Sequence, residues 1–472
     1  MAATAERARL AVIGAGPAGL AAALAAAARG VDVTLVDAGP EAGGQFYRQP
    51  AAALGARRAR ALHHQWRTWE RLRDGLAEHR AAGRVGHLTD HHVWCVERES
   101  AGFVVHALRG PAQEEPATVR ADAVLLATGG YEVVLPFPGW TLPGVVTAGG
   151  AQAMLKGGLV LPGRTAVVAG TGPLLLPVAT GLAAAGARVA ALVESADPRA
   201  LLRRPSALAA QPGKLAEGAG YAVRLLRHRT RLLTRRTVVE AHGRDRLEAV
   251  TVAALDAGGR IRPGVEHRIP CDTLAVGHGM LPHTDLAETL GCTLNGTDVH
   301  VDDEQRTDVP GVWAAGETTG IGGAALALAE GHIAGRSVAA RLHGREPDPA
   351  AWSAAARARA RLRTFFAAVD AVYPPPARWP ERVPDDTVAC RCEEVTAGEV
   401  RAAVTGLGAG DLRTVKLLTR AGMGWCQGRV CGPAVAGLAG CEPTPSRRPF
   451  ARPVPLGVLA RAPEDPVEEE PS

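Results

Sequence analysis

The sequence predicts an α/β protein with two dinucleotide-binding units and a small, α-rich C-terminal domain. An apolar strand, a glycine-rich turn and a helix occur near the N-terminus, and the same order returns near residue 165. Five of the eight cysteines fall after residue 389. A chain of 472 residues is also too long for one hydrophobic core, so several domains are expected.

The first unit centres on a strand that runs into Gly14-x-Gly16-x-x-Gly19. Gly14 permits the tight turn, Gly16 lets the backbone approach a pyrophosphate, and Gly19 lets the helix pack closely on the strand. The next strand ends at Asp37, whose carboxylate can accept hydrogen bonds from an adenosine ribose. The alternative is a glycine-rich turn in an empty βαβ unit. The candidates here are Gly14, Gly16, Pro17, Ala18, Gly19 and Asp37.

Three later segments could contact the same nucleotide. The glycine-rich segment 38–48 could lie along the isoalloxazine side of a flavin, or it could be a plain surface loop. A buried strand over 121–126 ends in small residues, and a short strand before residue 316 ends in Gly-Glu, whose carboxylate could bond a ribityl hydroxyl. The helix that follows would point its positive end at the flavin ring. These candidates are Gly44, Gln45, Arg48, Ala127, Thr128, Gly129, Gly316, Glu317 and Gly323.

The second unit follows a Pro/Gly-dense boundary at 135–144 and departs from the pattern at one position. Leu175 stands where the third glycine is expected, so its side chain would push the helix from the strand or occupy space that a pyrophosphate needs. Glu194, at the end of the second strand, could still accept bonds from a ribose. Weak binding of NAD(P) or another adenine nucleotide and a vestigial, structural unit both remain open.

The order of these motifs resembles the two-dinucleotide-domain flavoproteins of the glutathione-reductase type. That resemblance implies FAD in a first domain that the second domain interrupts. Two departures matter: the usual final Asp is Glu317, and no close cysteine pair occurs before Cys390, so disulfide-reductase chemistry is not expected. The predicted ranges are 8–150 and 271–343 for the FAD domain, 151–270 for the second domain, 345–384 for a linker with a helix, 385–445 for the cysteine-containing domain and 446–472 for a Pro-rich and acidic tail.

Four cysteines near the C-terminus occur in two close pairs, Cys390-x-Cys392 and Cys426-x₄-Cys431. Four thiolates can bind a tetrahedral Zn ion or a [2Fe–2S] cluster. The spacing departs from the Cys-x₂-Cys knuckles usual for Zn, and it resembles the ferredoxin-like domain of bacterioferritin-associated ferredoxin with a longer second gap. We therefore favour [2Fe–2S], with Zn or free thiols as the alternatives. Cys441 is not expected to be a ligand.

The joint arrangement, with Gly-Trp-Cys-Gln-Gly-Arg-Val-Cys-Gly-Pro as its most specific part, resembles the larger subunit of bacterial flavin amine dehydrogenases. These include octopine/nopaline oxidase A subunits, the hydrogen cyanide synthase B subunit and proline or hydroxyproline dehydrogenase α subunits. In that family a glycine-oxidase-like flavoprotein subunit oxidises the substrate, and a small ferredoxin-type subunit can also be present. The resemblance implies that no catalytic residue need exist in this chain, which carries electrons through its FAD and its cluster.

The composition excludes several other classes of protein. Aromatic residues make up only 4%, which removes the stacking platform of a single-strand nucleic-acid binder. No apolar run approaches the length of a membrane span, and the first residues lead into a strand rather than a signal peptide. We expect a cytoplasmic protein that is peripheral to the membrane at most through its complex. The tail could dock on a partner or on its own body.

Three functions follow from these expectations. The preferred one is an electron-transfer subunit of a dehydrogenase that oxidises an amino acid, an opine or a related secondary amine. The second is a stand-alone NAD(P)H-dependent FAD/[2Fe–2S] reductase, against which Leu175 argues. The third is a redox or iron sensor, against which the flavin motifs argue.

Overall fold

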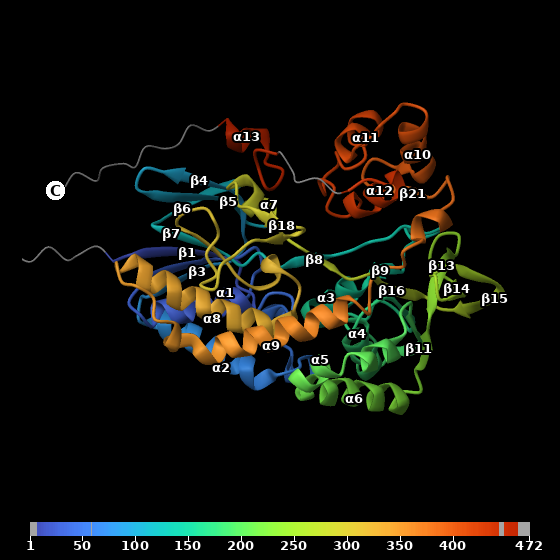
Figure 1. The fold of residues 1–472 in the computed structure, drawn as a ribbon, viewed down its shortest axis with the longest axis horizontal. Helices are drawn as coiled ribbons and strands as arrows, with labels where there is room; N and C mark the ends of the chain where they lie inside the picture. The colour runs from blue at the N-terminus through green and yellow to red at the C-terminus, as the bar shows by residue number, and fades with distance from the viewer. Residues whose placement is uncertain (1–6, 58, 443–447, 461–472) are drawn as a thin grey trace, which may run out of the picture.

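Two parallel, five-stranded sheets organise the chain. Figure 1 shows the overall fold. The computed structural model describes residues 7–57, 59–442 and 448–460. The first sheet, ordered β20-β7-β1-β2-β3, contains Arg9–Ile13 (β1), Asp32–Val36 (β2), Val85–Leu88 (β3), Ala123–Leu126 (β7) and Val312–Ala314 (β20). The second, ordered β12-β11-β10-β16-β9, contains Val145–Thr147 (β9), Thr165–Gly170 (β10), Arg188–Glu194 (β11), Arg231–Thr234 (β12) and Thr273–Gly277 (β16). The predicted two-unit α/β fold is confirmed.

Two strands of the second sheet lie outside the range predicted for the second unit. β9 and β16 pair with each other, and β16 also pairs with β10, whereas the predicted ranges place both strands in the FAD domain. The chain therefore crosses between the sheets nearer to residues 130–144 and 278–282. There Gly130–Glu132 (β8) and Met280–Pro282 (β17) form a separate antiparallel pair.

Helix Pro17–Ala27 (α1) is covered on both sides, which explains why all of its faces carry apolar residues. The first sheet lies on one side, and helix Gly323–Leu342 (α8) lies on the other. A Cβ added at Gly331 or Gly335 of α8 would lie 2.1 or 2.3 Å from a backbone oxygen of α1. The two helix backbones are therefore in direct contact, which no larger residue permits.

Helices and smaller sheets cover both parallel sheets. The helices are Trp66–Ala81 (α2), Ala148–Gly158 (α3), Leu175–Ala184 (α4), Pro205–Ala210 (α5), Pro212–Arg227 (α6) and Asp285–Thr289 (α7). One antiparallel sheet contains His91–Glu99 (β4), Gly102–Arg109 (β5) and Glu115–Ala121 (β6), and another contains Arg236–His242 (β13), Ala249–Leu255 (β14) and Ile261–Pro270 (β15). Leu294–Asn295 (β18) and Asp298–Val299 (β19) form a short pair.

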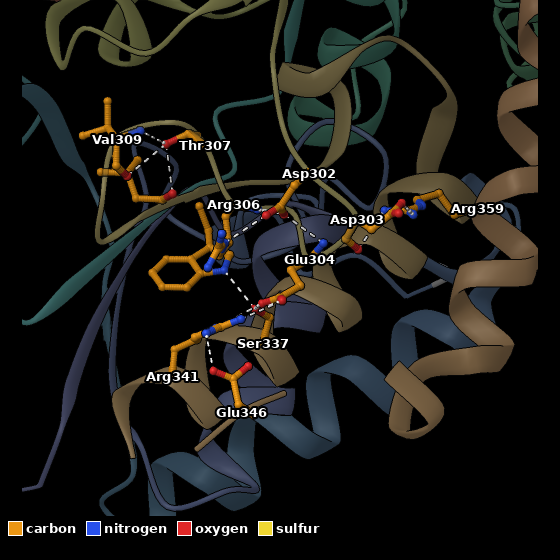
Figure 2. A network of polar contacts seen from close by, with 12 residues as sticks. Asp302, Asp303, Glu304, Arg306, Thr307, Val309, Ser337, Arg341, Glu346 and Arg359 are labelled. Atoms are coloured by element: carbon orange, nitrogen blue, oxygen red, sulfur yellow. Dashed lines mark hydrogen bonds and ion pairs between the residues drawn. The ribbon is translucent and has the colours of Figure 1, made fainter. Parts of the chain in front are cut away.

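The predicted linker helix exists as Ser353–Asp370 (α9), and ionic contacts hold it and α8 to the loop before β20 (Figure 2). Arg359 of α9 lies 2.6 Å from Asp303 of this loop. Glu304 lies 2.9 Å from Arg341 of α8 and accepts a 2.8 Å hydrogen bond from Ser337. The Glu304 contacts therefore tie this loop and β20 to α8, whereas the Asp303 side chain is fully exposed and adds little.

The C-terminal domain consists of Val388–Cys390 (β21), Val395–Thr396 (β22), Ala397–Thr405 (α10), Leu412–Thr419 (α11) and Gly432–Ala439 (α12). Figure 1 shows these helices grouped on one side of the molecule, apart from the parallel sheets. Trp140, in the crossing between the two units, donates a 2.7 Å hydrogen bond to the carbonyl of Val388.

The described part of the tail lies on the protein's own body, where Ala451 bonds to Trp94 of β4. It ends in helix Leu456–Leu459 (α13), and the acidic residues after 460 lie outside the described residues. Within the described chain, no helix is long and apolar enough to cross a bilayer.

Candidate functional site

The first glycine turn has the shape that a pyrophosphate requires. Gly14 has φ +106°, and a Cβ there would lie 2.3 Å from the carbonyl oxygen of Ala127. A Cβ at Gly19 would lie 1.8 Å from the carbonyl oxygen of Gly14. Beside Gly16, in contrast, no atom lies within 4 Å of an added Cβ. Gly14 and Gly19 are therefore needed for packing, whereas Gly16 faces open space that a ligand can enter.

Asp37 closes this turn from the end of β2. Its Oδ1 accepts a 3.0 Å hydrogen bond from the amide of Ala15, and its Oδ2 accepts one of 3.3 Å from Gly39. Burial raises the pKa of Asp37, although these amides and Arg48 oppose the effect. The acid thus holds the turn without using the amide of Gly16.

The segments 38–48 and 316–323 meet beside this turn. A Cβ at Gly44 would lie 2.8 Å from Cα of Gly16, so the first segment crosses the turn closely. A Cβ at Gly316 would lie 2.7 Å from Cβ of Ala18. The buried carboxylate of Glu317 accepts a bond from the amide of Gly323 at the start of α8, and burial raises its pKa.

Thr128 and Gly129 extend the site toward α7. The Thr128 hydroxyl donates a 2.6 Å hydrogen bond to the carbonyl of His283 and lies 3.3 Å from the hydroxyl of Thr318. The carbonyl of Gly129 accepts a 2.9 Å bond from the amide of His283. The structure therefore brings Gly14, Gly16, Gly19, Asp37, Gly44, Ala127, Thr128 and Gly316 together, with Pro17 starting α1 and with Ala18 packed on Gly316.

Gln45 and Arg48 lie where the segment 38–48 borders the second unit, and Arg48 is still close enough to Asp37 to act on its pKa. Arg48 Nη2 donates a 2.8 Å bond to Gln45 Oε1, and its Cδ lies 3.3 Å from a Cβ added at Gly157 of α3. Next to Gly157, Lys156 donates a 3.2 Å bond to the carbonyl of Phe46, and burial together with Arg48 lowers its pKa to about 8. The sequence analysis missed Lys156, because nothing local shows that α3 packs on this loop.

A buried ion pair also supports the site and was not predicted. Glu330 of α8 is 1% exposed and accepts hydrogen bonds from the amide of Gly316 at 3.1 Å and from Arg363 of α9 at 2.7 Å. Thr319 donates a further bond of 3.1 Å to the same carboxylate. A single acid in an Ala/Leu-rich helix was the available signal. Through this ion pair, the linker helix holds the Gly316–Thr319 turn in place.

The second turn is occupied by its own acid. Glu194 is 4% exposed, its Oε2 accepts a 3.0 Å hydrogen bond from the amide of Gly172, and its Oε1 accepts one of 2.9 Å from Ala196. Gly172 holds the place that Gly16 holds in the first turn. Leu175 is 1% exposed and packs in the hydrophobic core, where the missing side chain of Gly277 leaves room for it. The amide that would face a pyrophosphate is thus already bonded within the protein.

The four cysteines meet as a chain of neighbours. The Cys392 thiol is hydrogen-bonded to Cys426, Cys426 to Cys431, and Cys431 to Cys390. A bond from Cys431, opposed by burial but helped by nearby amides, lowers the pKa of Cys426 and so favours the thiolate, the form that binds iron. Within the described ranges, no three or more His, Cys, Asp or Glu side chains converge as they would around a single metal ion.

Glycines allow the loop of residues 422–432, called the cluster-binding loop, to pass close to the other cysteines. A Cβ at Gly424 would lie 2.1 Å from Cβ of Cys392. The amide of Gly422, with φ +81°, lies 3.4 Å from the sulfur of Cys390 and donates to it. Backbone amides directed at sulfur are typical of iron–sulfur sites, where they tune the potential. This donor set and its tight glycine packing fit a [2Fe–2S] cluster.

Comparisons with known proteins agree with both sites. A family described as pyridine nucleotide-disulphide oxidoreductase matches residues 8–339, more than half of the chain. The chain belongs to this family. A second family, described as a BFD-like [2Fe-2S] binding domain, matches residues 388–439. FAD and a [2Fe–2S] cluster are therefore its cofactors, and the residues described above fit them.

Full-length relatives place the chain in a narrower group of subunits within the family. The A subunit of opine oxidase from Rhizobium meliloti is 36% identical over 95% of this chain and 97% of its own length. The HcnB subunit of hydrogen cyanide synthase from Pseudomonas aeruginosa is 36% identical over 89% of this chain and 90% of its own. The solved structure of L-proline dehydrogenase from P. horikoshii shares the fold, with a TM-score of 0.66, 21% identity and coverage of 97% of this chain and 81% of that one.

The predicted flavin site is tested by Gly16→Val. Gly16 has φ −72°, which valine tolerates, and its surroundings are open, so the substitution blocks only an approaching pyrophosphate. We expect folded protein without flavin, measured by absorbance after purification. The matched control is Gly213→Val, at an exposed helical position with the same open surroundings, which should retain flavin. Normal flavin in Gly16→Val would move the nucleotide elsewhere.

The predicted cluster ligands are tested by Cys426→Ser. We expect loss of the cluster absorbance while the flavin stays bound, because the two sites share no residue. Cys441→Ser should keep both absorbance bands, since Cys441 lies beyond α12. A normal iron content in Cys426→Ser would remove Cys426 from the ligand set.

The buried Glu194 predicts a pH dependence of stability. Burial raises the pKa of Glu194 from 4.5 to about 7. Between these values the folded chain holds the proton and the unfolded chain does not, so the free energy of unfolding falls as pH rises. At 1.4 kcal/mol per pKa unit, the fall is roughly 3 kcal/mol. Glu194→Gln lacks this titration, so its stability relative to the unmodified protein should rise between pH 5 and pH 8 in urea denaturation. An equal change in both proteins would contradict the prediction.

Proposed function

We propose that this chain is the electron-transfer subunit of a hetero-oligomeric dehydrogenase that oxidises an amino acid, an opine or a related secondary amine. The relatives that match over nearly their whole length are named as subunits, of opine oxidase and of hydrogen cyanide synthase. A glycine-oxidase-like flavoprotein subunit would carry the substrate site, and a small ferredoxin-type subunit could complete the complex. We place the complex in the cytoplasm.

One observation carries this proposal: the backbone amide of the second glycine turn is already bonded to an acid of the same unit. The Gly172 amide is bonded to Glu194, and Leu175 fills the core where the third glycine would stand. Since the first unit holds the FAD, NAD(P)H would have to bind at the second turn and displace Glu194 from the Gly172 amide. Without that displacement, electrons would have to reach the flavin from another subunit.

The residues of this chain hold the two redox groups. FAD supplies two-electron chemistry when bound, and the cluster passes electrons one at a time. The turn formed by Gly14, Gly16 and Gly19 would hold the pyrophosphate. The Gly316–Glu317 turn lies beside it and is held in place by a hydrogen bond from the Gly316 amide to Glu330. The cysteines and the glycines between them hold the cluster. None of these residues needs to take a proton from a substrate, which agrees with a relay rather than a substrate-oxidising subunit.

The competing function is a stand-alone NAD(P)H-dependent reductase that passes electrons to a partner protein. Anaerobic titration of the purified holoprotein with NADH and NADPH separates the two. We expect no bleaching of the flavin or the cluster by either nucleotide and full bleaching by dithionite. Rapid, stoichiometric bleaching by a nicotinamide nucleotide would instead mean that Glu194 yields to a bound nucleotide, and the reductase would replace our proposal.

A further inference from the structure

An arginine between two cluster cysteines is bonded to the flavin-binding domain. Arg429 lies in the turn between Cys426 and Cys431, and its Nη1 donates a 3.4 Å bond to the carbonyl of Cys426. Its Nε lies 3.1 Å from Oδ2 of Asp285, the first residue of α7. Its Nη2 donates to the carbonyl of Ala451 in the tail. The guanidinium therefore has its three nitrogens directed at three separate segments of chain.

Asp285 is placed to receive this arginine and is poorly accessible to water. The residue is 8% exposed, and its carboxylate lies 3.0 Å from Arg448 and 3.0 Å from the imidazole of His283, in addition to Arg429. Burial opposes its ionisation, but His283 and the two arginines lower the pKa of Asp285 to about 2. A charged carboxylate in such a site requires cationic partners.

His283 connects this ion pair to the flavin side of the molecule. Its amide donates to the carbonyl of Gly129, and its carbonyl accepts from Thr128 and Thr318, which are the residues at the ends of β7 and β20. The ring of Tyr131 packs edge-on against the His283 ring, with centroids 6.2 Å apart. Hydrogen bonds and ion pairs thus run without interruption from the strand ends of the flavin domain to the backbone of a cluster ligand.

We propose that Arg429 and Asp285 are positioning residues that fix the cluster-binding loop against the flavin domain for electron transfer. The proposal rests on the proposed function, since it assumes that electrons pass between the two groups. The reduced flavin would pass one electron to the cluster, where one ferric iron would become ferrous, and the rate of this transfer would depend on how firmly the two sites are held. Trp140 contacts the C-terminal domain at Val388, outside the cluster-binding loop. The Arg429–Asp285 pair, which we call the clamp, therefore determines how the loop itself is oriented.

The test uses Asp285→Asn and Arg429→Lys in the full-length holoprotein, with Asp303→Asn as the matched control. Asp303 also joins an arginine of another element, Arg359, but its side chain is fully exposed. Hydrogen–deuterium exchange of the amides over 422–432 is the first measurement. We expect exchange about tenfold faster or more in Asp285→Asn, because removing one partner of a buried pair leaves the other charges uncompensated. Arg429→Lys should show a smaller increase, since one ammonium cannot reach three segments.

The second measurement is the rate of flavin-to-cluster transfer after flash photoreduction with a deazaflavin. We expect Asp285→Asn to lose the fast phase that the unmodified protein and Asp303→Asn show. Hydrogen–deuterium exchange is measured in protein with and without the cluster, so that faster exchange caused by loss of the cluster is not mistaken for loss of the ion pair. Exchange and transfer in Asp285→Asn equal to those of the control would overturn the clamp. Absence of transfer in the unmodified protein would instead overturn the proposed function, while the exchange result would still decide the clamp.

Discussion

The contact between the backbones of α1 and α8 is the constraint on which the rest of the site depends. The first glycine turn leads into α1, and α8 follows the turn at Gly316 and carries the buried Glu330 that binds this turn. Only Gly331 and Gly335 allow the helices to approach so closely, since an added Cβ at either would meet a backbone oxygen. Overpacking at such a contact costs about 1–3 kcal/mol and displaces backbone. Segments about three hundred residues apart in sequence therefore form one nucleotide site.

The two glycine turns differ in which backbone amide their acid binds. Asp37 reaches the amide of Ala15 and leaves the amide of Gly16 free for a ligand. Glu194, which is one methylene longer, reaches the amide of Gly172 and occupies the equivalent position. Both turns leave open space beside their second glycine, but only the first also leaves the amide of that glycine unbonded to its own acid. The same βαβ architecture thus holds its acid in two different ways in the two units.

Motifs whose function is local could be predicted from the sequence. These motifs are recognised from residues that are close in sequence. They include the first glycine turn and the acid after it, and the close cysteine pairs of the C-terminal domain. Asp37 meets its turn through neighbouring parallel strands, a geometry that the βαβ unit itself dictates. Leu175 was correctly singled out, although it fills the core rather than the nucleotide space.

Contacts between distant elements could not be predicted in this way. β9 and β16 were assigned to the wrong unit because a buried strand carries no signal of which sheet it joins. The packing of Arg48 on α3 was likewise not predicted, and its place at the flavin stays a prediction. The pairs Glu330–Arg363 and Asp285–Arg429, which hold the linker helix and the cluster-binding loop to the flavin domain, join residues with no periodicity or spacing in common.

Two redox groups held by one chain must together accept a fixed number of electrons, and an electron count tests this most directly. Anaerobic titration with dithionite, followed by flavin absorbance and by the paramagnetic resonance signal of the reduced cluster, gives the number of electrons accepted. We expect about three electrons per chain, two for the flavin and one for the cluster. An uptake of two electrons without a cluster signal, in protein that contains zinc instead of iron, would contradict the presence of both groups.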